Sequence, residues 1–253
     1  MPTLSEIISK DWALAAVSDT PELEIRWLLE DLLDRPASYL RSHSDVEFEP
    51  ALFQRFQEML SRRLKGEPLA YILGHWGFWS LDLLVSPTTL IPRPETELLV
   101  ELAIQLHENR QNIRALDLGT GTGAIALAVA SERPDWQITA TDQSTEIIEV
   151  ALSNALRNDV RSVQFKVGGW YQALVNDTEL FDLIVSNPPY IEPDDPHLGQ
   201  GDVRFEPVSA LVANDDGLAD LREIVSRAGV NTSIVNFLGS WFSKGFGSSH
   251  PSA

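Results

Sequence analysis

Hydrophobic residues recur at helical spacing through the first part of the chain. A capping-box pattern at Thr3 and Glu6 opens an apolar series that runs to Trp12. Pro21 and Pro50 each precede a further apolar series, in the position that proline favours at the start of a helix. The pattern predicts a small domain made only of helices over residues 1–75.

The periodicity changes between residues 76 and 93. Apolar residues alternate loosely with polar or small ones from Phe78 to Val85, and prolines then interrupt the chain. A period of two is typical of strands, so we expect a β-hairpin that connects two domains. A helix is expected from about Pro94 to Glu108.

Strands and helices alternate from residue 113 onward. The expected strands are 113–118, 137–141, 163–167 and 181–186, and the expected helices are 123–132, 144–158 and about 215–228. Alternation of this kind implies a parallel sheet with right-handed crossovers. The sequence therefore predicts an α/β domain over residues 94–253.

A glycine-rich loop, DLGTGTGA, follows the first of these strands at residues 117–124. Its glycines allow a sharp turn and a close approach to a ligand. Asp142 ends the next strand, where an acid can accept ribose hydroxyls. The loop suits a dinucleotide, through Gly119, Gly121 and Ala124, or S-adenosylmethionine. Asp117 favours S-adenosylmethionine, because a carboxylate there would repel a pyrophosphate but suits an ammonium or sulfonium group.

The fourth strand ends in the motif Asn-Pro-Pro-Tyr at residues 187–190. Ligands bind at the carboxyl ends of parallel strands, so Asn187 is expected beside the glycine loop. The nitrogen of a planar amide or aromatic amine is a poor nucleophile and needs acceptors for both of its N–H hydrogens. The Asn187 side-chain oxygen and the Pro188 carbonyl can supply them, while Pro189 stiffens the backbone and Tyr190 packs on a flat substrate.

The composition of the chain limits the classes of binding partner that we expect. The net charge is −18, which disfavours phosphate backbones, so we expect no direct nucleic-acid partner. The chain has no cysteine, and its five histidines show no metal-ligand spacing, so no metal is expected. Its first residues have no basic stretch followed by an apolar core, and no apolar run approaches 18 residues, so we expect neither a secretory signal nor a membrane span. We expect a cytoplasmic, monomeric protein without membrane contact.

The charged residues Arg93, Glu95 and Glu97 allow two interpretations. They shape the entrance for a substrate, or the acids stabilise the first turn of the helix that follows. The sequence leaves both interpretations open.

Four stretches resemble the release factor glutamine methyltransferases. They are RLKGEPLAYILG (63–74), LIPRPETE (90–97), DLGTGTGAIAL (117–127) and NPPY (187–190). The similarity extends to about Arg227. NPPY alone is shared with adenine N6 methyltransferases, whereas the IPRPETE segment behind a helical domain is far more specific.

The resemblance implies a Rossmann-like class I methyltransferase sheet behind a helical substrate-recognition domain. It implies S-adenosylmethionine as methyl donor and the glutamine of the Gly-Gly-Gln loop of peptide chain release factors as acceptor. The implied cofactor contacts are Gly119, Thr120, Gly121, Thr122, Gly123, Asp142 and Trp170. Asn187, Pro188, Pro189 and Tyr190 correspond to the glutamine clamp. Relatives often carry an acid or a serine between the glycine and Trp170, where this chain has Gly169.

The chain departs from the family after Arg227. Relatives continue with a glycine turn, an apolar strand, a helix and a hairpin, whereas this tail has short apolar stretches among Ser, Asn and Gly. We expect the C-terminal strands to be missing or altered, as after a frameshift. The strand that bears NPPY would then be an exposed edge, with lower stability and weak cofactor binding.

Three other functions remain as alternatives. An adenine N6 nucleic-acid methyltransferase would use the same NPPY clamp but needs a basic groove. A non-catalytic relative would bind the release factor or the cofactor without turnover, and the altered tail supports it. An NAD-dependent dehydrogenase is opposed by Asp117 and leaves NPPY unexplained.

Overall fold

The computed structural model describes residues 1–175, 180–231 and 237–239. Its contacts divide the chain into two units. One unit comprises residues 1–74 with 196–205, and the other comprises residues 75–195 with 206–253. The segment 196–205 therefore belongs to the helical unit, although it follows NPPY and the sequence pattern placed it within residues 94–253.

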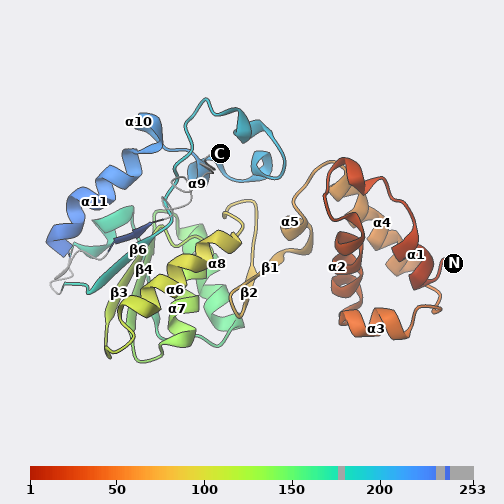
Figure 1. Cartoon of the computed structure of the whole chain (residues 1–253), viewed down its shortest axis with the longest axis horizontal. Helices are drawn as coiled ribbons and strands as arrows, with labels where there is room; N and C mark the ends of the chain where they lie inside the picture. Colours follow the sequence, from red (N-terminus) through yellow and green to blue (C-terminus); the bar gives the residue numbers. More distant parts are fainter. Residues whose placement is uncertain (176–179, 232–236, 240–253) are drawn as a thin grey trace, which may run out of the picture. The chain divides into compact units, whose positions relative to one another are not determined.

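The first unit is built from short helices (Figure 1). They are α1 (Leu4–Ser9), the 3-10 turn η1 (Leu14–Ala16), α2 (Pro21–Leu33), α3 (Ala37–Ser42), α4 (Pro50–Leu64) and α5 (Leu69–Leu73). The segment 196–205 adds two 3-10 turns, η4 (Pro196–Gly199) and η5 (Val203–Phe205). Helices α2 and α4 pack through fully buried residues such as Leu28, Leu29 and Phe56.

The helix starts follow the sequence signals. The Thr3 backbone N–H donates to the Glu6 carboxylate at 2.8 Å, which completes the expected capping box. Pro21 and Pro50 are the first residues of α2 and α4, as expected. Trp12 is not part of the first helix, which ends at Ser9; its indole N–H instead donates to the carbonyl of Ile7 at 2.7 Å and so satisfies a helix-end acceptor.

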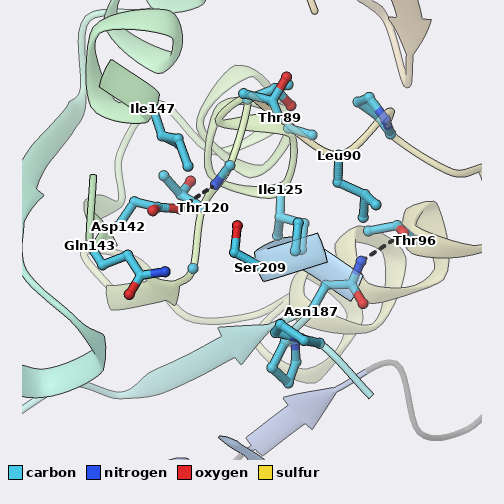
Figure 2. Close-up of a pocket in the computed structure, with 18 of the residues that line it drawn as sticks. Thr89, Leu90, Thr96, Thr120, Ile125, Asp142, Gln143, Ile147, Asn187 and Ser209 are labelled. Atoms are coloured by element: carbon cyan, nitrogen blue, oxygen red, sulfur yellow. Dashed lines mark hydrogen bonds between the residues drawn. The ribbon is translucent and has the colours of Figure 1, made fainter. Parts of the chain in front are cut away.

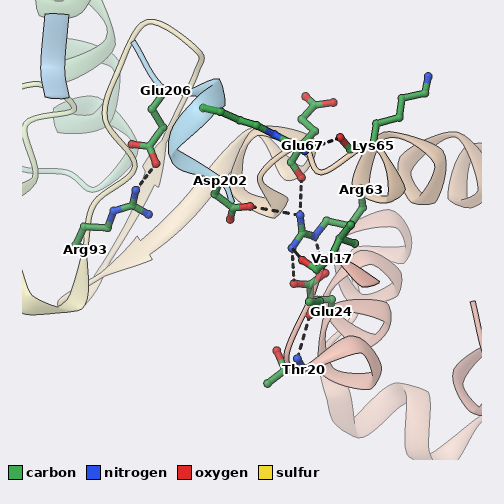
Figure 3. A network of polar contacts seen from close by, with 11 residues as sticks. Val17, Thr20, Glu24, Arg63, Lys65, Glu67, Arg93, Asp202 and Glu206 are labelled. Carbon is green, nitrogen blue, oxygen red and sulfur yellow. Dashed lines mark hydrogen bonds and ion pairs between the residues drawn. The ribbon is translucent and has the colours of Figure 1, made fainter. Parts of the chain in front are cut away.

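A single buried arginine joins the parts of this helical unit (Figure 3). The Arg63 guanidinium donates to the Glu24 carboxylate at 2.7 Å and to the carbonyls of Val17 and Glu67 at 2.7 and 3.1 Å. Its Nη1 atom also contacts Asp202 at 3.4 Å. The side chain of Arg63 is 4% exposed, so these partners balance a buried charge that would otherwise be costly.

The second unit begins with the expected hairpin of β1 (His75–Phe78) and β2 (Leu81–Leu84). Asn154 of the helix α8 (Thr145–Arg157) and Asn158, which directly follows that helix, hold the hairpin by its backbone. The Asn154 side chain bonds both the N–H and the carbonyl of Leu84, at 2.6 and 3.1 Å. The Asn158 side chain does the same for Asp82, at 3.0 Å each.

The core of the second unit is a parallel sheet in the order β5-β4-β3-β6-β7. The strands are β3 (Arg114–Leu118), β4 (Gln137–Asp142), β5 (Val163–Val167), β6 (Leu183–Ser186) and β7 (Phe237–Gly239). The first four match the expected strands within two residues. The predicted Rossmann-like methyltransferase sheet is confirmed.

Alternating side chains of the central strands reach two separate cores. Ala115, Leu183 and Val185 pack on one face with α6 (Glu97–Leu106) and α7 (Ala124–Glu132). Leu116 and Ile184 pack on the other face with the 3-10 turn η3 (Trp170–Leu174) and α11 (Ala219–Asn231). This alternation is what a strand buried on both faces requires.

The helix expected over residues 215–228 is divided. A short turn, α10 (Asn214–Gly217), precedes α11. Asp215 and Asp216 have φ angles of 58° and 55°, which a continuous right-handed helix does not allow. A further short helix, α9 (Val208–Leu211), lies between the NPPY strand and α10 in sequence.

The strand that bears NPPY is not an edge, contrary to our expectation. β7 pairs with it in parallel, with Ile184 opposite Phe237 and Ser186 opposite Gly239. The short apolar stretch Phe237–Gly239 supplies the backbone partners that we expected to be missing. The remainder of the altered tail, residues 232–236 and 240–253, lies outside the described residues. None of the described helices is long and apolar enough to cross a membrane.

Candidate active site

A cavity of about 180 Å³ lies where β3, β4 and β6 end (Figure 2). Most of the expected site residues line it: Gly119, Thr120, Gly121, Thr122, Asp142, Trp170, Asn187, Pro188 and Pro189. Asp117, Gly123 and Tyr190 are not among the lining residues. The fold therefore brings the glycine loop and the NPPY motif to one cavity, as expected from the carboxyl ends of neighbouring parallel strands.

The glycine loop is held by the neighbouring strand. The backbone N–H groups of Gly119 and Thr120 both donate to the carbonyl of Thr141 at 2.9 Å. Gly119 has a φ angle of 71°, and a Cβ there would come within 3.1 Å of the Trp170 ring. A side chain at this position would thus be strained and would also press on the ring. At Gly121 a Cβ would meet nothing within 4 Å, so this part of the loop borders open space.

Asp117 supports the loop from within the protein. Its carboxylate is buried and accepts a hydrogen bond from the Thr120 hydroxyl at 2.6 Å. Burial raises the pKa of the Asp117 carboxyl to about 6, and the Thr120 hydrogen bond opposes that shift. The carboxylate thus contacts the cavity lining through the Thr120 hydroxyl.

Asp142 lines the cavity at the end of β4. One carboxylate oxygen accepts the backbone N–H of Gly121 at 3.0 Å, and the other accepts that of Ser144 at 3.4 Å. Burial raises the pKa of the Asp142 carboxyl, and these backbone donors act against the shift. A carboxylate has about four lone-pair positions, so both oxygens keep capacity for a ligand's hydroxyl groups.

Trp170 lies across the glycine loop in an unusual backbone conformation. Its φ angle is 47°, which is rare for an aromatic residue and is a form of stored strain. The Thr141 hydroxyl donates to its carbonyl at 3.3 Å, and its ring lies against Gly119. The strained conformation is therefore held in place from two sides.

Asn187 offers an acceptor at the cavity. Its side-chain Nδ2 atom donates to the Thr96 hydroxyl at 3.4 Å, while its Oδ1 atom is buried and has no hydrogen-bond partner in the described part of the chain. A buried polar atom without a partner is energetically unfavourable unless a ligand supplies the missing hydrogen bond. Ser186, the preceding residue, fixes the strand end by donating to the Leu118 carbonyl at 2.7 Å.

Comparisons with known proteins bear on this site. A PrmC N-terminal domain model matches residues 13–74, and a methyltransferase small domain model matches residues 94–200. The release factor glutamine methyltransferase of Vibrio cholerae is 53% identical over 211 residues, covering 83% of this chain and 73% of that protein. That of Aliivibrio fischeri is 50% identical over 209 residues, covering 82% and 72%. The Escherichia coli protein of the same name is 46% identical over 212 residues, covering 83% and 75%.

The chain belongs to the release factor glutamine methyltransferase family. The resemblance drawn from four sequence stretches is thereby confirmed. Those stretches include the glycine loop and NPPY, which the fold brings to the cavity.

The segment that carries the family's IPRPETE stretch contributes more than the sequence indicated. Thr96 meets Asn187, and Arg93 forms an ion pair with the buried carboxylate of Glu206 (Figure 3). The Glu206 carboxylate also accepts the backbone N–H of Ile91 at 3.4 Å. Arg93 lines the cavity, whereas the Glu97 carboxylate accepts the backbone N–H of Trp79 at 2.8 Å and so holds the hairpin turn.

Several lining residues of this family member were not foreseen from its sequence. They come from four separate segments: Thr88, Thr89, Leu90, Thr96, Gln143, Ile147, Ser209 and Asp220. Three of them had a local signal, because Leu90 and Thr96 lie in the stretch 90–97 and Gln143 directly follows the acid at the end of β4. The other polar ones lie in stretches with no motif of their own.

Tyr190 lies just beyond the cavity wall in this family member. Its backbone N–H donates to the Leu211 carbonyl at 3.2 Å. A Cβ on Gly217 would come within 2.4 Å of the Tyr190 carbonyl oxygen, so this glycine permits a close approach of two backbones. The turn after NPPY is therefore fixed against residues 211–217.

Proposed function

We propose that this chain transfers a methyl group from S-adenosylmethionine to the side-chain amide nitrogen of a glutamine in a peptide chain release factor. The observation that carries the proposal is the buried Oδ1 atom of Asn187, which has no hydrogen-bond partner among the described residues and lies at a cavity that the glycine loop and Asp142 also line. Family membership and the names of the relatives support the choice of substrate.

The residues around the cavity fit S-adenosylmethionine. Asp142 would accept the ribose hydroxyls, because both of its oxygens keep lone pairs after bonding the backbone. The open side of Gly121 leaves room for a ligand against the loop. Asp117 and Asp142 give this end of the sheet negative charge, which suits a cationic ligand. When bound, S-adenosylmethionine supplies an electrophilic methyl group on a positively charged sulfur.

The NPPY motif provides what an amide acceptor needs. Asn187 Oδ1 and the Pro188 carbonyl would each accept one N–H of the glutamine amide, which fixes its plane and aims its nitrogen. Positioning of this kind can supply roughly 7–11 kcal/mol toward the barrier. The nitrogen–carbon bond forms as the carbon–sulfur bond breaks, the sulfonium becomes a neutral thioether, and the nitrogen releases one proton to water. Because that proton leaves after transfer, no strong base is needed.

The two units take separate roles in this proposal. Residues 1–75 would recognise the release factor, residues 76–93 would connect, and residues 94–253 would bind the methyl donor. Matches to a PrmC N-terminal domain and to a methyltransferase small domain support this division. Substitutions on exposed positions of the helical unit should raise KM for the release factor and leave cofactor affinity unchanged.

The test is methyl transfer from labelled S-adenosylmethionine. A purified release factor, its Gly-Gly-Ala loop variant and duplex DNA serve as acceptors in parallel. The proposal expects label on the wild-type factor alone. Label on DNA would favour the adenine alternative, and binding of S-adenosylhomocysteine without label on any acceptor would identify a non-catalytic relative.

A further inference from the structure

Position 169, directly before the tryptophan, is a glycine and offers no side chain to a ligand. Gly169 and Trp170 line the cavity after β5, at the end where the family resemblance places the adenine. An acid or a serine before the tryptophan could accept a hydrogen bond from a ligand, and a glycine side chain cannot. Another part of the chain supplies a carboxylate to the lining of the same cavity.

That carboxylate is Asp220, in the first turn of α11. It lines the cavity together with Gly169 and Trp170, although 50 residues separate it from Trp170 in the sequence. The Trp170 side chain hydrogen-bonds the Asp220 carboxylate, and burial raises the pKa of that carboxyl. The indole N–H fills one acceptor position, and a carboxylate has about four, so capacity for a second donor remains.

The start of α11 is fixed in place. Gly217, three residues before Asp220, packs its Cα against the Tyr190 backbone with a φ angle of 76°. One turn later, the carbonyl of Ile224 accepts the buried Tyr171 hydroxyl at 2.9 Å, and the Ile224 side chain is fully buried in the core. Asp220 therefore stands on a preorganised element. A favourable interaction with the helix N-terminus would explain an acid in this turn but not its place in the cavity.

We propose that Asp220 accepts the exocyclic amino group of the adenine and so replaces the contact that Gly169 cannot make. In this role, Asp220 selects for adenine as the purine base of the cofactor. This inference rests on the proposed function, since it takes S-adenosylmethionine as the ligand. A carboxylate accepts hydrogen bonds only, so it favours an amino group at position 6 of the purine and disfavours an oxygen there.

Binding of two product analogues tests the inference without turnover. Isothermal calorimetry would measure S-adenosylhomocysteine and S-inosylhomocysteine, which differ in an amino or an oxo group at that position. The adenosyl compound would gain a hydrogen bond to a charged group, whereas the inosyl compound would leave the carboxylate without that donor. We therefore expect a preference for the adenosyl compound of roughly 10-fold to 100-fold. Asp220→Asn should reduce this preference to a few-fold or less, because an asparagine amide can donate to the oxo group as well as accept.

The control variant is Glu223→Gln, on the same helix. Glu223 is exposed, forms an ion pair with Arg227 and acts on the Asp220 carboxyl through its charge and not through a hydrogen bond, so this change should leave the preference nearly unaltered. Equal affinity of the wild-type protein for both analogues would overturn the inference, and this arm needs no variant to fold. Equal weakening of both analogues by Asp220→Asn would also overturn it, because Asp220 would then act only on Trp170. Failure of the wild-type protein to bind either analogue would instead contradict the proposed function.

Discussion

The Asn187 side chain donates to the Thr96 hydroxyl at 3.4 Å, which connects two segments 91 residues apart. This contact occupies the amide nitrogen of Asn187, whereas its Oδ1 atom accepts no hydrogen bond from the part of the chain that the structure describes. Thr96 is 8% exposed and follows Arg93, whose guanidinium pairs with Glu206. The segment around Thr96 therefore holds the amide that is proposed to bind the substrate.

Replacing Thr96 tests this positioning role. Thr96→Val keeps the shape of the side chain but removes the hydroxyl, so the Asn187 amide loses the partner that sets its orientation. We expect kcat for methyl transfer to fall roughly 10-fold or more, because small misplacements of reacting groups are costly. The affinity for S-adenosylhomocysteine should change little. Thr96→Ser, which restores the hydroxyl, should recover most of the rate; an unimpaired valine variant would contradict the role.

Asp117 makes stability depend on pH in a defined direction. Its folded-state pKa is raised to about 6 from 3.8, so the folded protein retains a proton that the unfolded chain has released. The stability linked to this proton is present below pH 3.8 and is lost as pH rises through 6. The resulting cost at neutral pH is on the order of 3 kcal/mol.

Asp117→Asn should remove that cost. An asparagine oxygen can still accept the Thr120 hydroxyl, and the variant carries no charge to bury. We expect the variant to gain stability over the wild type at pH 8 and to gain little at pH 4. Urea unfolding at both pH values measures the difference. A gain that is equal at the two pH values would show that the charge of Asp117 is not its source.

The buried pair of Arg63 and Glu24 predicts a large effect in the helical unit. Arg63→Met would leave Glu24, which is 7% exposed, without its partner. Breaking a buried pair on one side costs roughly 3–5 kcal/mol. Arg62→Met is the matched control, because Arg62 is 45% exposed and pairs with Glu67 at the surface, where a pair is worth about 1 kcal/mol or less. Equal destabilisation by the two variants, in urea unfolding, would be incompatible with this account.

His107 should destabilise the protein in mild acid. The residue is buried, its two ring nitrogens have no hydrogen-bond partner among the described residues, and its ring packs against the edge of Trp136. Burial lowers the pKa of His107, and the positive charges of Arg110 and Arg133 add to this shift, while Asp182 opposes it. The unfolded chain therefore takes up a proton first as pH falls below about 6.5.

The free energy of unfolding therefore decreases as the pH falls below the ordinary pKa of histidine. His107→Leu should flatten this part of the stability curve while it keeps the apolar contact with Trp136. Thermal unfolding at pH 5.5 and pH 7.5 compares the two proteins. A variant that loses as much stability in acid as the wild type would exclude His107 as the source.

Local signals in the sequence were enough for most of the fold. Pro21 and Pro50 mark helix starts because proline fixes the backbone and lacks an N–H that the first turn does not need. The glycine loop and Asp142 identified the ligand end of the sheet because these residue types have few other reasons to follow buried strands. The order of the central strands then brought NPPY to the same cavity.

The features that the sequence did not predict depend on packing between segments far apart in the chain. Thr96 and Asp220 line the cavity because distant segments meet there. Thr96 lies in the IPRPETE stretch, but its contact with Asn187 could not be read from that stretch, and Asp220 belongs to no motif. Asp117 was expected to face the ligand, but its buried carboxylate does not line the cavity and bonds the hydroxyl of the lining residue Thr120. The strand that bears NPPY was expected to be an edge, but Phe237–Gly239 pairs with it. This stretch of three residues is too short for its hydrophobic periodicity to predict a strand.

The most direct test of the central claim is the position of the transferred group. The chain would be incubated with S-adenosylmethionine and a purified release factor, and the peptide containing the Gly-Gly-Gln loop would be fragmented in a mass spectrometer. The account predicts one added methyl group on the glutamine side-chain amide, and its loss when Asn187→Ala replaces the wild-type chain while S-adenosylhomocysteine still binds. An unmodified glutamine from a folded, cofactor-binding protein, or a methyl group on another residue, would contradict it.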